Sequence, residues 1–213
     1  MPWVATTSFE TTDGTASPVD GNDLLGTGDG SGWSATWADG GLGAGWDYDS
    51  GIAEAGSWSV ITSTNAELLR NITTAVVSGI VKVSMRSSAK NGTFAFLLFV
   101  PGVGSKYIIS LTAGGDITLT GTTVVTLLTN YTLDTWNVIH MSFDGSTAKA
   151  RLAADSAWSA TVNSNAAGDV GRVRLEMSGI TAGTRSFDNI AEGSEPSAAA
   201  VTLPSNLPLL KVG

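Results

Sequence analysis

Cysteine is absent from this 213-residue sequence and histidine occurs only once. Without cysteine the chain forms neither a disulfide nor a thiolate metal site, and a single histidine cannot build a histidine-rich zinc centre. Charged residues are also scarce, at 14%, and acidic ones outnumber basic ones to give a formal net charge of −8. Nucleic acid and anionic membranes repel such a chain, so we expect neither as a partner.

Long apolar runs and the parts of an export signal are missing as well. No run approaches the roughly 18 apolar residues of a membrane span. The opening stretch, MPWVATTSFE, has no basic segment followed by an apolar one. A surface rich in Ser, Thr and Gly is nevertheless typical of extracellular domains. We therefore expect another route to the outside, such as release within an assembled particle.

Strand patterns recur at short intervals, whereas helix signals are nearly missing. Apolar and polar residues alternate over 79–87, which is the period-two pattern of a half-buried strand. Residues 93–113 read as a hairpin with Pro101 and Gly102 in its turn, and Asp144-Gly145 marks a second hairpin. Strands separated by tight turns over an apolar fraction of 42% predict one antiparallel sandwich or barrel domain.

Residues 13–51 form a long segment crowded with glycine and aspartate, which must be tied down to persist in a compact domain. A helix would place Trp33 and Trp37 on one face, but each surrounding glycine costs about 1 kcal/mol relative to alanine. Burial of an indole contributes roughly 2–3 kcal/mol. We therefore interpret the two tryptophans as anchors that hold the segment against the sandwich.

Three stretches, taken in order, resemble a known family. These are SFETTDGTASPVDGNDLLGTGDGSGWSATW, DTWNVIHMSFDGSTAKARLAADSAWSA, and GRVRLEMSG followed by RSFDNIAEGS. Together they resemble the concanavalin A-like (laminin G-like) jelly-roll domains, over residues 8–193. The resemblance implies an all-β fold over 1–193: a two-sheet antiparallel sandwich with six or seven strands per sheet and adjacent first and last strands. We expect residues 194–213 to follow it as an extended C-terminal arm.

Catalytic patterns known from this family are missing. Its laminarin- and agar-cleaving members carry E-x-D-x-x-E on one strand, which places two carboxylates on one face for a retaining mechanism. No glutamate of this sequence lies in that pattern. His140 lies mid-strand on the face opposite Ile139, Met141 and Phe143, so we interpret it as a surface-facing or hydrogen-bonded strand residue. We therefore predict no enzymatic activity, with a lyase or hydrolase of unfamiliar carboxylate placement as an open alternative.

The resemblance also implies one structural metal site. It places a calcium ion where the first and last strands meet, with Glu10 and Asp188 as ligands and backbone carbonyls of the glycine-rich segment beside them. Calcium prefers such oxygen ligands. The alternative is that both carboxylates are solvated or capped by turn amides.

Exposed aromatic rings are the candidates for binding carbohydrate, because a sugar stacks its C–H face on an uncovered ring with polar groups beside it. The candidates share nearby polar residues such as Asp47, Asp49 and Asn163; they are Trp46, Tyr48, Trp58 and Trp158. The alternative is that these rings fill the core, as most aromatic rings in a sandwich do.

The C-terminal arm carries apolar side chains between prolines, and they would contact neighbouring subunits: Leu203, Leu207, Leu209 and Leu210. With the absent signal and catalytic pattern, the arm predicts a non-enzymatic structural protein that decorates or cements a virion surface, such as that of a phage. Its partners would be further copies of the chain and a capsid lattice. The alternative is an extracellular carbohydrate-binding module that adheres to glycans.

Overall fold

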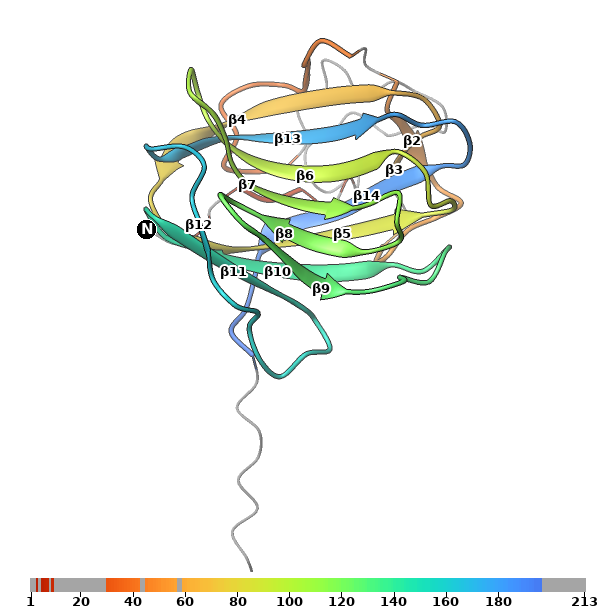
Figure 1. Cartoon of the computed structure of the whole chain (residues 1–213). Helices are drawn as coiled ribbons and strands as arrows, with labels where there is room; N and C mark the ends of the chain where they lie inside the picture. Colours follow the sequence, from red (N-terminus) through yellow and green to blue (C-terminus); the bar gives the residue numbers. More distant parts are fainter. Residues whose placement is uncertain are drawn as a thin grey trace, which may run out of the picture.

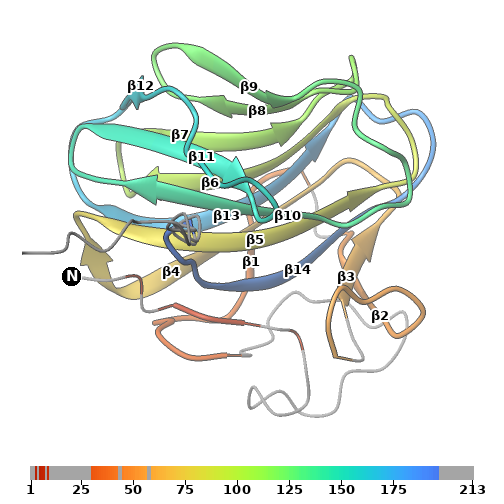
Figure 2. The same cartoon turned by 90° about the horizontal axis from the view of Figure 1, so that it is seen from below.

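The computed structural model describes residues 3, 5–7, 9, 30–42, 45–56 and 59–196. Over these residues the chain forms fourteen strands and no helix, so none that could cross a membrane. The strands build two seven-stranded antiparallel sheets that face each other as a sandwich (Figures 1 and 2). This confirms the all-β, two-sheet architecture predicted from the sequence.

The first sheet has the order β1-β4-β13-β6-β7-β8-β9. Its strands are β1 (Ala38–Asp39), β4 (Ala66–Val76), β13 (Val170–Ser178), β6 (Thr93–Val100), β7 (Gly104–Leu111), β8 (Ile117–Thr120) and β9 (Val124–Leu128). The second sheet has the order β12-β11-β10-β5-β14-β3-β2. Its strands are β12 (Val162–Asn163), β11 (Thr147–Leu152), β10 (Asn137–Phe143), β5 (Gly79–Ser87), β14 (Arg185–Glu192), β3 (Ser59–Thr62) and β2 (Asp47–Asp49).

Both hairpins expected from the sequence are present. β6 and β7 pair across a turn that contains Pro101 and Gly102, and β10 pairs with β11 across Asp144-Gly145. The Asp144 carboxylate accepts hydrogen bonds from the backbone N–H groups of Ser146, at 2.8 Å, and Thr147, at 2.6 Å. These bonds lower the pKa of Asp144 to about 2, because they favour its charged form.

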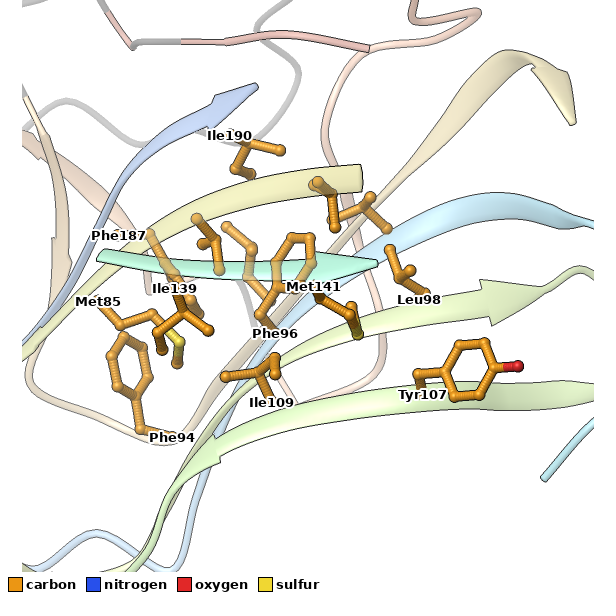
Figure 3. Packing of buried hydrophobic residues seen from close by; sticks show 14 of the residues in the cluster. Met85, Phe94, Phe96, Leu98, Tyr107, Ile109, Ile139, Met141, Phe187 and Ile190 are labelled. Carbon is orange, nitrogen blue, oxygen red and sulfur yellow. The ribbon is translucent and has the colours of Figure 1, made fainter. Parts of the chain in front are cut away.

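Aromatic and aliphatic side chains from both sheets interdigitate to form the core (Figure 3). The rings of Phe94 and Phe187, one from each sheet, lie 4.3 Å apart between centroids. Trp46, just before β2, packs on both of them at 6.2 and 5.3 Å. All three side chains are at most 1% exposed, so the sheets are joined by dense apolar packing.

The two tryptophans tie the described part of the glycine-rich segment, from residue 30 on, to the sandwich, as predicted. Trp37 is buried, Trp33 packs on the core, and the Arg70 guanidinium lies 5.0 Å and 5.5 Å from the two ring centroids. The Trp33 indole N–H also donates to the carbonyl of Thr6 at 3.1 Å.

The first and last parts of the described sandwich are adjacent, as the family resemblance implied. The backbone N–H of Thr7 donates to the carbonyl of Ile190 at 2.7 Å, in an antiparallel bridge.

Replacing Phe187 with alanine tests the packing between the sheets. We expect Phe187→Ala to lower the free energy of unfolding by about 3–5 kcal/mol, because it removes a buried ring and leaves a cavity. Val103→Ala is the control, since Val103 is 64% exposed; we expect a change below about 0.5 kcal/mol. Urea denaturation measures both, and equal effects would contradict the assignment of Phe187 to the core.

Candidate functional site

The outer face of β10 and β11 gathers polar and aromatic side chains at one edge of the second sheet. Because Ile139, Met141 and Phe143 point into the core, the alternate residues of β10 point outward. His140 pairs there with Arg151 of β11, and Ser142 pairs with Lys149. We call this surface, with the loop 153–161 that borders it, the β10–β11 face.

Trp158 is held against this face by the return of the loop 153–161 along β11. The Ser159 N–H donates to the carbonyl of Ala150 at 2.8 Å, and the Ala150 N–H donates to the Ser159 hydroxyl at 3.1 Å. The half-buried indole then lies against two cations, with Lys149 Nζ at 5.1 Å and Arg151 Cζ at 5.3 Å from the ring centroid.

A hollow of about 410 Å³ opens on the same face. Polar side chains and small residues line it: His140, Arg151, Ala153, Ala154, Asp155, Ser156, Ser194 and Glu195. Glu195 also accepts the Trp158 indole N–H at 2.8 Å, which fixes the orientation of the ring. The arrangement therefore places one oriented aromatic ring next to carboxylate and hydroxyl groups.

His140 and Arg151 clamp the end of the described chain onto the face. The backbone N–H of Ser194 donates to His140 Nδ1 at 3.0 Å, and Arg151 donates to the carbonyl of Ser194 at 2.9 Å. Figure 1 shows the chain after β14 running beside the loop that follows β11. Burial lowers the pKa of His140, and the charges of Arg151 and Lys82 lower it further, so the imidazole is neutral at pH 7.

His140 is thus a hydrogen-bonded strand residue, which is one of the two arrangements expected for it. It is not surface-facing, because the chain around Ser194 covers it and leaves it 7% exposed. Its acceptor nitrogen is already bonded to a backbone N–H.

Two of the four rings expected to bind carbohydrate lie in the core, which corrects that expectation. Trp46 is 0% exposed and Tyr48 is 2% exposed. Tyr48 pairs with Val60 across β2 and β3, on the inner side of the sheet. Neither ring offers a free face to a sugar. Trp58 lies outside the described residues, which leaves Trp158 as the ring that the structure places at an open surface.

Asp188 is fully buried on β14, and backbone amides bind its carboxylate. It accepts hydrogen bonds from the backbone N–H groups of Glu54, Ala55 and Asn189 at 2.9, 3.3 and 2.7 Å. Burial nevertheless raises the pKa of Asp188 to about 7, because desolvation outweighs these three bonds.

The calcium site remains a prediction. Glu10 lies outside the described residues, and among those described no three His, Cys, Asp or Glu side chains form a group suited to a metal ion.

A pair of carboxylates on the outer face of the first sheet was not singled out from the sequence. Glu67 of β4 and Glu176 of β13 are direct cross-strand partners, and Arg174 contacts both, with Glu176 at 3.3 Å. Burial raises the pKa of Glu67, an effect that Arg174 opposes. Adjacent carboxylates are the groups that glycoside hydrolysis uses. Here one guanidinium binds an oxygen of each, which favours a salt-bridge network.

Solved structures resemble the chain in fold at low sequence identity. The Bacillus licheniformis beta-glucanase is 11% identical, with a TM-score of 0.52 over 90% of this chain and 98% of that one. The likeness to this sandwich over nearly the whole chain identifies the fold. The fold is a concanavalin A-like jelly roll. No family model and no curated protein matches the sequence.

Two other structures share this jelly-roll sandwich. Domain 4 of a GH43 extracellular arabinanase from Geobacillus stearothermophilus, solved with arabinotriose, is 14% identical, with a TM-score of 0.50 over 87% of this chain and 92% of that one. A sialidase is 11% identical, with a TM-score of 0.53 over 71% of this chain; the match spans only 17% of the sialidase chain.

The raised pKa of Asp188 makes stability depend on pH. Its folded pKa, about 7, exceeds the ordinary value of 3.8. The carboxyl group therefore favours folding most below pH 4, and this stability is lost as the pH rises through 7. Between pH 5 and pH 8 the loss is on the order of 2–3 kcal/mol. Urea denaturation at several pH values should show this decline.

Asp188→Asn provides the comparison, since the amide does not titrate. We expect the variant to lack the Asp188 share of the pH dependence, whatever its absolute stability. His140 contributes with the opposite sign, because its lowered pKa makes the unfolded chain bind the extra proton, but this contribution is common to both proteins. Identical pH profiles for the two proteins would show that Asp188 ionises normally.

Proposed function

We propose that the protein binds carbohydrate through the β10–β11 face and does not cleave it. The observation that carries the proposal is the placement of Trp158: a half-buried ring, oriented by Glu195 and backed by Lys149 and Arg151, beside a 410 Å³ hollow. Sugars are bound by this combination, because their C–H faces stack on aromatic rings while their hydroxyls bond to nearby polar groups.

Polar groups suited to sugar hydroxyls line the hollow, and one of them, Glu195, contacts the ring. Asp155 and Glu195 are acceptors at the lining, and Ser156 and Ser194 add hydroxyl groups that both donate and accept. Arg151 instead donates its hydrogen bonds to backbone carbonyls, those of Leu152, Ala153, Asp155 and Ser194. These bonds fix the positions of Ala153, Asp155 and Ser194, which line the hollow.

Binding without cleavage is supported by the state of the reactive groups. The sequence has no E-x-D-x-x-E strand, and the cross-strand glutamates are bound by Arg174. The Nδ1 atom of His140 already accepts the backbone N–H of Ser194, so this nitrogen is not available to take a proton from a substrate. The arabinanase domain with arabinotriose illustrates that a sandwich of this kind can carry a sugar site.

Carbohydrate binding now ranks above the virion-decoration role that the sequence suggested first. The described residues include the ring and the polar groups on which the proposal rests, whereas the arm residues expected to join subunits, Leu203, Leu207, Leu209 and Leu210, lie outside them. The structural role, the capsid partners and the location on a virion or outside the cell stay predictions.

Replacing the ring of Trp158 tests the proposal. We expect the protein to bind a subset of glycans on an array. Trp158→Ala should raise the dissociation constant for the most tightly bound glycan about 10- to 100-fold. Trp158→Phe keeps a ring but loses the N–H bonded to Glu195, so its affinity should lie between those of the parent protein and Trp158→Ala. Val124→Ala, on the exposed edge strand β9 of the other sheet, is the matched control and should bind as the parent does.

Two results would overturn the proposal. A parent protein that binds no glycan, or binds one with the same affinity after Trp158→Ala, would rule out this site. Release of new reducing ends or unsaturated sugars from the bound polysaccharide would show that the protein is an enzyme.

A further inference from the structure

A second tryptophan stands on the same face as Trp158. Trp136 immediately precedes β10 and falls on the outward positions of that strand, together with Val138, His140 and Ser142. Its side chain is half-buried and lines a hollow of about 230 Å³, with Val138, Leu152, Ala153 and Ala154 also at the wall.

Three hollows follow one another along the β10–β11 face. The first, about 180 Å³, lies at the paired residues Ser142 and Lys149. The second is the 410 Å³ hollow at the next pair, His140 and Arg151. The third is the Trp136 hollow, which shares Ala153 and Ala154 with the second. The hollows follow the direction of the strands, and the chain crosses the face at Ser194 and Glu195, so a ligand in this row would pass over these two residues.

The two tryptophans mark separate positions along this row. The Trp158 ring lies against Lys149 and Arg151, which pair with Ser142 and His140. Trp136 lies four residues from His140 and six from Ser142, so the separation along the strand is about 14–20 Å at 3.4 Å per residue. One sugar ring cannot contact both indoles, whereas an extended oligosaccharide can.

The charges along the row favour an uncharged ligand. The first hollow has the Asp144 carboxylate beside Lys149, the second has Asp155 and Glu195 beside Arg151, and the third has no charged side chain. The whole chain carries a net charge of −8. Carboxylates match or outnumber the cations in the first two hollows, so the row offers no excess of positive charge to a carboxylate or sulfate group, whereas neutral hydroxyls can donate to the carboxylates.

We infer that Trp136 is a second stacking platform and that the ligand is a linear, neutral polysaccharide laid along β10 and β11, with about three or more sugar units in contact. This inference rests on the proposed function, since it extends the Trp158 site. It adds the chain length and charge of the ligand and a binding residue that no sequence pattern indicated.

Calorimetric titration with oligosaccharides of increasing length tests the inference. The probes are neutral gluco-oligosaccharides and arabino-oligosaccharides of one to six units, and oligomannuronates of the same lengths as charged counterparts. We expect affinity for the preferred neutral series to rise up to at least three units. We expect Trp136→Ala to lower the affinity for the hexamer about tenfold and to leave the affinity for the shortest bound oligomer unchanged. Trp158→Ala should lower the affinity for both.

Trp136→Phe should restore part of the hexamer affinity, and thermal unfolding of each variant separates lost binding from lost fold. Equal hexamer affinity for Trp136→Ala and the parent, with Trp158→Ala still impaired, would overturn the inference and leave the proposed function standing. Affinity that does not rise with length, or tighter binding of oligomannuronates, would also overturn it. Binding of none of the probes by the parent would overturn the inference, whereas the proposed function is overturned only if the parent also binds no glycan on the array.

Discussion

Two-residue alternation along β10 and β11 is the constraint on which the rest of the structure depends. The inward residues of β10 must fill the space between the sheets, so their neighbours are turned to the outer face in fixed order. The pairing of His140 with Arg151 and of Ser142 with Lys149 then sets where polar groups stand. Shifting the register by one residue would bury those groups and expose the core, which makes the face as firmly specified as the core.

Polar side chains on this face mostly hold the chain itself. Arg151 bonds to four backbone carbonyls and His140 accepts the Ser194 N–H, so both stabilise the loop after β11 and the chain after β14. Such bonds to charged donors contribute about 1.5–3 kcal/mol each. Anchoring the loop leaves Trp158 in one orientation before any ligand arrives, which lowers the entropy cost of binding.

Much of the sandwich follows from local patterns, but exposure of single rings does not. The Asp144-Gly145 turn and the alternation after it predict β10 and β11 directly. β4 has a weaker pattern, because Glu67 and Arg70 interrupt its apolar residues and are buried through ion pairing and stacking on tryptophan. Trp46 and Trp158 look alike in sequence, since both follow small residues. Their different exposure is set by tertiary structure: Trp46 is buried where β2 packs on the core, and Trp158 is held at the surface by the loop 153–161.

Indole N–H resonances offer the most direct measurement, because the described tryptophans include two on the β10–β11 face and three that are buried in the core. Titration with a bound neutral oligosaccharide, followed by heteronuclear NMR, should shift the indole signals of Trp158 and Trp136 and the amides of β10 and β11. The buried indoles of Trp3, Trp37 and Trp46 should stay in place. Shifts confined to the outer face of β4, β13 and β6, around Arg174, would place the sugar on the other sheet and contradict the assignment of the β10–β11 face.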